Sequence, residues 1–212
     1  MGYSKEVWTE RIAGRSDLSS QLVHLTRTAE NDGKETRPVH VLVKILCDRR
    51  IEGSTTASGF ICGDRPATCF QDIPVYSVSQ NIRSEEQYRL EHPDAKVRYE
   101  GIGLMFPKSY VFRKGGRPVI YEDTEVAKAM LPQDEWWRIV KLDLSNRKHF
   151  VDWTHEREWR VPDGFDFNLG KATVLLSSPD AYRRFIKLCK NPKREHLLSE
   201  IRGVICLGGV FF

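Results

Sequence analysis

The sequence contains no long hydrophobic run. Its first residues, MGYSKEVWTERIAGRSD, include no apolar stretch of the signal-peptide type. No run elsewhere reaches the length that a membrane-spanning helix needs. We therefore expect a cytoplasmic protein that has no membrane partner.

Cysteine pairs and zinc-ligand spacings are also absent. The five cysteines are an odd number and form no CxxC pair, which is typical of reduced cytosolic thiols. Cys62 and Cys69 are seven positions apart, and His149 and His155 are six apart. Neither spacing is usual for zinc, so we expect no metal site.

Several enzyme motifs are missing. The chain has no GxxxxGK[ST] loop, no GxGxxG after a strand and no GxSxG elbow, so nothing indicates a P-loop, a Rossmann dinucleotide site or a serine nucleophile. In the stretch 152–163, no carboxylate stands two residues before a lysine, the spacing that is typical of nucleases. A metal-dependent nuclease stays open only if Asp152, Glu156, Glu158 and Asp163 group around one divalent ion.

What is present is an ordinary globular composition, with 212 residues, 40% hydrophobic and 29% charged. A chain of this length buries roughly 70% of its unfolded surface, enough for one domain. We expect a single domain over residues 1–212, with residues 1–18 as an N-terminal extension. The net charge of +4 is compatible with anionic ligands and leans slightly toward nucleic acid.

The hydrophobic pattern predicts an α+β domain with a mixed or mainly antiparallel sheet rather than a doubly wound fold. A polar loop is expected over 27–38, and Gly101 and Gly103 predict a close approach of backbones. Helices are expected at 5–14, 39–51, 79–95 (with Pro93 at its end) and 179–201 (with a break at 191–192). Strands are expected at 19–26, within 99–123, and at 136–144, 153–162, 172–178 and 203–212.

The stretch WTHEREWRVP, residues 153–162, carries the strongest candidate for chemistry. In an extended chain, Glu156, Glu158 and Arg160 share one face. Such a Glu-x-Glu is either a solvated charge ladder or a carboxylate pair held for catalysis. His24 in LVHLT is by itself more typical of a structural histidine, but the two features together favour a site.

Several segments together resemble known families. LVHLT followed by VLVKILCDRRI resembles the opening of the H-type ADP-ribosyltransferases. The chain also resembles a bacterial family of AbiG-type abortive phage infection proteins. Four stretches carry this resemblance, in this order: CFQDIP, RYEGIGLMFPKSYVFRKGGRPVIY, HEREWRVP and EIRGVICLG. The resemblance covers roughly residues 20 to 208.

The resemblance implies an ADP-ribosyltransferase-like split β-sandwich, in which two small mixed or antiparallel sheets with flanking helices hold NAD in a cleft. It makes Glu158 the catalytic glutamate and Glu156 the upstream member of the Glu-x-Glu pair. The residues implied to bind NAD are His24 at the ribose, Leu25 through its backbone, Thr26 beside them, Phe70 or Tyr121 on the nicotinamide ring, and Arg27, Arg65 and Arg160 at the pyrophosphate.

The chemistry of NAD cleavage explains these residue types. Breaking the N-glycosidic bond builds positive charge on the ribose, and a carboxylate bonded to the ribose hydroxyl binds more strongly as that charge develops. A second carboxylate is placed to accept a proton from the attacking group. Because adjacent carboxylates repel, we expect Arg157 or Arg160 to keep both ionised.

Three functions follow. The first is an NAD-dependent ADP-ribosyltransferase, a toxin or effector of phage defence that modifies nucleic acid or protein and has a cognate antitoxin or other defence partner. The second is a catalytically inactive binding or regulatory module on the same fold, because some AbiG-type members are antitoxin-side partners. The third is the nuclease. A surface ion pair between Glu158 and either Arg157 or Arg160 would favour the second function, the catalytically inactive module. The ending GGVFF is short of a helix that the resemblance leads us to expect.

Overall fold

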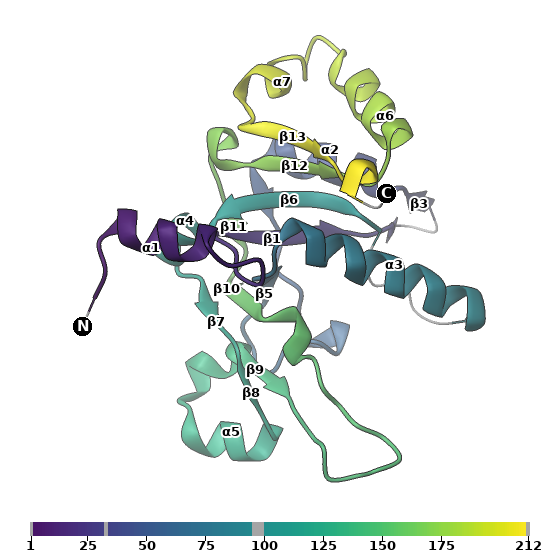
Figure 1. Cartoon of the computed structure of the whole chain (residues 1–212). Helices are drawn as coiled ribbons and strands as arrows, with labels where there is room; N and C mark the ends of the chain where they lie inside the picture. Colours follow the sequence, from purple (N-terminus) through teal and green to yellow (C-terminus); the bar gives the residue numbers. More distant parts are fainter. Residues whose placement is uncertain (1, 32–33, 95–99, 211–212) are drawn as a thin grey trace. The chain divides into compact units, whose positions relative to one another are not determined.

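The computed structural model describes residues 2–31, 34–94 and 100–210, and these divide into two compact units (Figure 1). Unit 1 comprises Met1–Arg49, Ile73–Phe106 and Phe167–Phe212. Unit 2 comprises Arg50–Asp72 and Pro107–Asp166. Each unit therefore joins segments that are distant in the sequence.

The sheet of unit 1 contains four neighbouring strands in the order β13-β12-β6-β1. Their bounds are Gly203–Cys206, Thr173–Leu176, Ile102–Pro107 and Gln21–Thr26. β12 runs parallel to β13 and antiparallel to β6, so the sheet is mixed. The expected loop at 27–38 is wrong in part, because β2 (Ala29–Asn31) and β3 (Lys34–Thr36) pair as a short antiparallel ladder.

Five α-helices belong to unit 1, among the residues described. They are α1 (Lys5–Ala13), α2 (Pro38–Asp48), α3 (Val75–Glu91), α6 (Pro179–Cys189) and α7 (His196–Glu200). The side chains of Ser4 and Ser178 accept hydrogen bonds from the first turns of α1 and α6, as N-cap serines do. α3 ends before Pro93 as predicted. The expected last strand stops at Cys206, and a 3₁₀ helix, η5 (Leu207–Val210), follows it.

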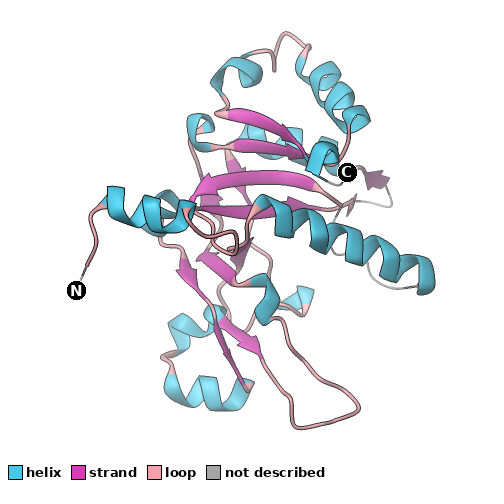
Figure 2. Cartoon of the chain, viewed as in Figure 1, coloured by secondary structure: helices cyan, strands magenta, loops and turns pink. Residues whose placement is uncertain are grey.

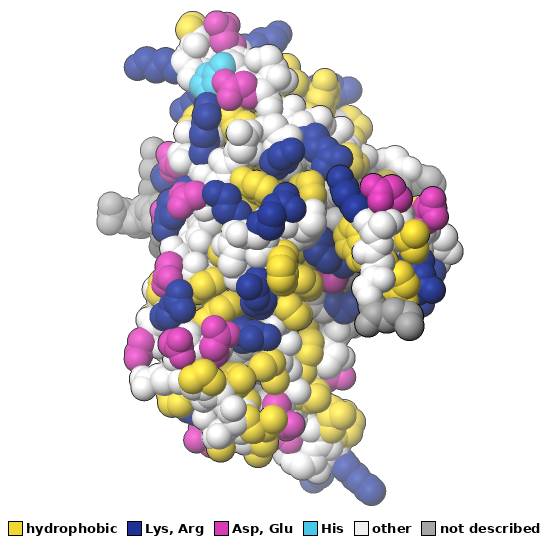
Figure 3. Space-filling view, turned by 90° about the vertical axis from the view of Figure 1, so that its left-hand side faces the viewer, with side chains coloured by type: hydrophobic (Ala, Val, Ile, Leu, Met, Phe, Trp, Pro, Cys, Tyr) yellow, Lys and Arg dark blue, Asp and Glu magenta, His cyan; other side chains and the backbone are white. Residues whose placement is uncertain are grey.

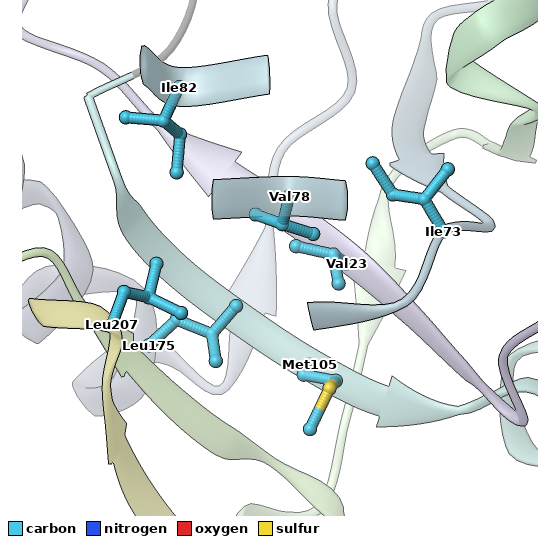
Figure 4. Packing of buried hydrophobic residues seen from close by; sticks show 7 residues of the cluster. All are labelled: Val23, Ile73, Val78, Ile82, Met105, Leu175 and Leu207. Atoms are coloured by element: carbon cyan, nitrogen blue, oxygen red, sulfur yellow. The ribbon is translucent and has the colours of Figure 1, made fainter. Parts of the chain in front are cut away.

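An apolar cluster fills one face of this sheet (Figure 4). The sheet supplies Val23 from β1, Met105 from β6 and Leu175 from β12, and α3 covers them with Val78 and Ile82. Ile73 and Leu207 complete the cluster. All seven side chains are at most 8% exposed, so their burial gives unit 1 a non-directional source of stability.

The predicted close approach of backbones occurs at Gly103. A Cβ added there would lie 2.1 Å from the carbonyl oxygen of His24, so no larger residue fits without moving β6 away from β1. Gly101 has a φ of +67°, a conformation that favours glycine. Gly103 therefore sets how closely β6 lies beside β1.

The main strands of unit 2 lie in the order β5-β10-β7, all antiparallel (Figure 2). Their bounds are Ala67–Gln71, Glu158–Pro162 and Arg117–Pro118. Two further pairs are β4 (Arg50–Ile51) with β11 (Phe165–Asp166), and β8 (Ile120–Glu122) with β9 (Ile139–Lys141). Helices α4 (Lys108–Arg113) and α5 (Thr124–Met130) and the 3₁₀ helices η1 (Thr56–Ser58), η2 (Gln133–Arg138) and η3 (Thr154–Glu156) complete unit 2.

The predicted α+β class with a mixed sheet is confirmed. In unit 2, the strand expected at 136–144 is shortened to β9 because η2 occupies the residues before it. α5 lies in a segment for which no element was expected. None of the helices in the described part of the chain has the length and apolarity needed to cross a membrane.

Candidate functional site

The stretch WTHEREWRVP is not one continuous strand. Thr154–Glu156 form the 3₁₀ helix η3, and Arg157 adopts a left-handed conformation with φ of 46°. The carboxylate of Asp152 accepts hydrogen bonds from the backbone N–H and the hydroxyl of Thr154, an Asx turn that competes with an extended chain. The expected alternation of faces through 153–162 is therefore wrong before Glu158, where β10 begins.

Glu158 and Arg160 form a buried ion pair on one face of β10. Nε of Arg160 lies 2.8 Å from Oε1 of Glu158, and Nη2 lies 3.3 Å from Oε2. The two side chains are only 3% (Arg160) and 9% (Glu158) exposed. Both carboxylate oxygens are thus held by one guanidinium in the two-pronged geometry that makes arginine–carboxylate bonds strong.

Three backbone carbonyls bind the remaining donors of Arg160. Nη1 donates to the oxygens of Trp137 at 2.8 Å and Ile139 at 3.1 Å, and Nη2 donates to that of Phe60 at 3.0 Å. A guanidinium has five N–H donors, and all five are used. Burial is the largest influence and lowers the pKa of Arg160, but the charges and hydrogen bonds of Glu158 and Cys69 together outweigh it, so the pKa is raised. Arg160 therefore joins β10 to the loop at Phe60 and to the junction of η2 and β9.

Tyr121 and Cys69 lie next to this pair. The hydroxyl of Tyr121 accepts a hydrogen bond of 2.7 Å from the backbone N–H of Glu158, and burial raises its pKa to about 12. Cys69 of β5 lies opposite Arg160 in the strand register. Burial and then the charge of Glu158 raise the pKa of its thiol well above the ordinary value, so Cys69 stays protonated and is a poor nucleophile.

Two buried polar atoms of the same unit have no hydrogen-bond partner among the described residues. They are Oε1 of Gln71, which lies opposite Glu158 in the register, and Nε1 of Trp137, whose carbonyl accepts from Arg160. Sequence reasoning did not single out either residue, because burial of a polar side chain gives no sequence pattern. They extend the polar interior of unit 2 beyond the ion pair.

The structure places the residues expected at the ribose and nicotinamide amide in unit 1. His24 is half-buried on β1, and Arg27 just beyond it is exposed. The side chain of Leu25 packs against the apolar cluster. Thr26 is 3% exposed, and its hydroxyl lies 2.9 Å from the carbonyl oxygen of Ile102, to which it donates. Thr26 therefore ties β1 to β6.

The other residues expected to bind NAD lie in unit 2. Phe70 is 1% exposed, and its ring meets the edge of Phe165 with centroids 5.2 Å apart. Arg65 forms an ion pair of 2.5 Å with Asp163, whose pKa is lowered chiefly by that hydrogen bond. The ring of Phe70 is thus already packed inside unit 2, and the charge of Arg65 is already paired with Asp163.

The carboxylates of this region do not form a metal site in the part of the chain described. No group of three or more His, Cys, Asp and Glu side chains there is placed to hold a metal ion. Asp152 bonds to Thr154, and Glu158 bonds to Arg160. The convergence of three carboxylates that the nuclease hypothesis requires is thus not found among these residues.

Comparisons with known proteins add no family to this description. No family model, curated protein or solved structure matches the chain. The resemblance to ADP-ribosyltransferases and to AbiG-type proteins therefore remains an expectation from the short sequence motifs. The geometry around Glu158 is the main observation on which a function can be argued.

Proposed function

We propose that the chain is a non-catalytic binding or regulatory module of an abortive phage infection system, on an ADP-ribosyltransferase-like fold. The fold and the biological setting rest on the sequence resemblance. The absence of catalysis rests on one observation, the buried ion pair of Glu158 and Arg160.

The ion pair opposes the role that the resemblance gives to Glu158. A catalytic carboxylate must bond to the ribose hydroxyl of NAD as charge develops there. Both oxygens of Glu158 are already bonded to Arg160, and the side chain is 9% exposed. Releasing Glu158 would leave the guanidinium buried without its counter-ion, which costs about 3–5 kcal/mol.

Other expected NAD contacts support the same proposal. The hydroxyl of Thr26 donates to the carbonyl of Ile102, and the ring of Phe70 packs against Phe165. Groups that bind a ligand in a preformed site are normally directed into a pocket. These two side chains instead complete the interior of the unit to which each belongs.

The proposal is tested by NAD turnover and NAD binding in the same preparation. The purified chain is incubated with NAD, with and without added DNA, RNA and protein acceptors, and NAD is titrated by calorimetry. We expect no NAD loss under any condition. NAD loss that disappears in Glu158→Gln, with the circular dichroism spectrum unchanged, would overturn the proposal.

A second candidate is the NAD-dependent ADP-ribosyltransferase itself, with Glu156 as the working carboxylate. Glu156 stays partly exposed on η3, and its charge is close enough to contribute to the raised pKa of Cys69 beside the ion pair. This candidate predicts NAD loss that Glu156→Gln abolishes. Its acceptor remains nucleic acid or protein: on the face drawn in Figure 3, Lys and Arg side chains are intermixed with hydrophobic and acidic ones, a pattern that favours neither.

A further inference from the structure

β13 forms the outer edge of the sheet of unit 1. It ends the strand order, and among the described strands it pairs with β12 alone. The N–H of Arg202 donates to the carbonyl of Ala172 at 2.9 Å. Because peptide groups alternate in direction along a strand, those of Gly203 and Ile205 point away from β12. An edge of this kind is a template for a further strand.

An apolar groove runs along this edge. It has a volume of about 390 Å³ and is lined by Tyr182 and Ile186 of α6, Leu198 of α7 and Val204 of β13, with Ile201 between them. Figure 1 shows α6 and α7 beside β13. Tyr182 is 43% and Leu198 is 36% exposed. A peptide that adds a strand to a sheet gains affinity from main-chain hydrogen bonds and specificity from such hollows for alternate side chains.

Basic side chains border the groove. A second hollow shares Tyr182 and Ile186 with the groove and is also lined by Arg183, Lys187 and Lys190. Arg183 pairs with Asp180 on the same helix, while Lys187 and Lys190 are exposed. The charge beside the edge is therefore positive, and it complements a peptide that carries carboxylates.

We propose that unit 1 binds an extended, acidic peptide segment of a partner protein at the free edge of β13. The segment pairs with the peptide groups of Gly203 and Ile205, places apolar side chains in the groove and directs carboxylates toward Lys187 and Lys190. The inference rests on the proposed binding function and gives it a class of partner.

The charges beside the edge favour this occupant over a second copy of the chain. Two β13 edges that paired with each other would bring two copies of the same basic border together, and like charges across such an interface are unfavourable. β13 itself, with the sequence GVIC, supplies no carboxylate to offset that repulsion. A partner segment with acidic side chains avoids this repulsion between like charges.

The probe is a fluorescein-labelled decapeptide of alternating valine and glutamate, titrated with the full chain and followed by anisotropy. A matched peptide with lysine in place of glutamate serves as the comparison. We expect the acidic peptide to bind at least about tenfold more tightly, and its affinity to fall with added salt, because the charge pairs are at an exposed rim.

Gly203 offers a matched pair of variants that isolates the main-chain bond. A Cβ added at this position meets no atom within 4 Å, so alanine has room. Proline removes the N–H that faces the free edge and is tolerated there, whereas alanine keeps it. We expect Gly203→Pro to lose about tenfold in affinity and Gly203→Ala to stay within about twofold, with unchanged circular dichroism.

Lys187 and Arg184 give the matched pair for charge. Both are exposed on α6, but only Lys187 lines the second hollow. Lys187→Glu is expected to weaken binding of the acidic peptide several-fold. Arg184→Glu is expected to change the binding free energy by less than half as much as Lys187→Glu does. Equal effects would show that the net charge of the chain, and not this rim, attracts the peptide, and would overturn the proposal.

Three other outcomes would also overturn it. They are no binding of the acidic peptide at millimolar protein, equal binding by Gly203→Pro and Gly203→Ala, and a dimer in solution that Gly203→Pro dissociates, which would assign the edge to a second copy. NAD is titrated into the same samples. NAD turnover together with peptide binding would refute the proposed non-catalytic role and leave the groove intact, so the two proposals fail separately.

Discussion

The two units differ in what their interiors contain: both bury apolar side chains, but unit 2 also buries an ion pair. In unit 1 the face of the sheet beneath α3 is apolar, with Val23, Val78, Ile82 and Leu175 at 0% exposure. In unit 2 the cluster of Ile61, Ala67 and Trp137 is smaller, and an ion pair and its carbonyl partners lie beside it.

This difference determines which substitutions should destabilise each unit most. Apolar burial is roughly proportional to area, so unit 1 should lose stability in proportion to the atoms removed. A buried ion pair depends on both partners, and losing one costs more than the pair as a whole contributes.

The largest effect is expected from Glu158→Gln. The substitution removes the counter-ion of a guanidinium that is 3% exposed, so we expect the free energy of unfolding to fall by about 3–5 kcal/mol. Denaturant titration measures it. Glu156→Gln is the control, because that side chain is partly exposed and should change stability by less than about 0.5 kcal/mol. Equal losses in both variants would end the contrast between them.

A comparable but slightly smaller loss is expected from Leu175→Ala in unit 1. This side chain is completely buried in the apolar cluster, and its truncation should cost about 2–5 kcal/mol. Because no charge is involved, this loss should not change between low and high salt. Unfolding curves at two salt concentrations check this, and a salt-dependent loss would contradict it.

A smaller effect is expected from Trp159→Ala. Trp159 follows Glu158 on β10 but points to the other face of the strand and is only partly buried. A fully buried tryptophan would lose about 3–5 kcal/mol on truncation, so half-burial predicts about 1.5–2.5 kcal/mol. Denaturant midpoints measure this loss. A loss as large as that of Glu158→Gln would mean that the ring, and not the ion pair, stabilises β10.

The smallest effect concerns Tyr121 and pH. Burial raises the pKa of Tyr121 to about 12 in the folded chain, above the ordinary value of about 10. Its contribution to stability is therefore fully present below pH about 10 and is lost as pH rises through about 12. Tyr121→Phe should remove this part of the alkaline loss, and the exposed Tyr182→Phe should keep it. Identical alkaline profiles in the two variants would contradict this reading.

Much of the fold could be predicted because its signals are local. The apolar pattern of VHVLVKILCD and the positions of Pro93 and Pro192 predicted α2, the end of α3 and the break between α6 and α7. The turn at Thr154–Glu156 was missed because the Asp152 cap competes with a pattern that reads as a strand. α5 was missed because TEVAKAM is a short segment between strands.

The candidate site could be predicted only in part. The sequence indicated that Arg157 or Arg160 would neutralise the two glutamates, and Arg160 does pair with Glu158. The burial of that pair and the carbonyls of Phe60, Trp137 and Ile139 come from segments far apart in the sequence, so no local spacing could indicate them. A short-range pattern thus identified the right residues and left their setting to tertiary structure.

The most direct test of the central claim is a double-mutant cycle on Glu158 and Arg160, with stability measured for Glu158→Gln, Arg160→Met and the double variant. We predict that each single variant loses about 3–5 kcal/mol and that the double variant loses less than the sum by at least about 2 kcal/mol. Additive losses, or a Glu158→Gln variant as stable as the wild type, would contradict the claim that this glutamate holds the structure together.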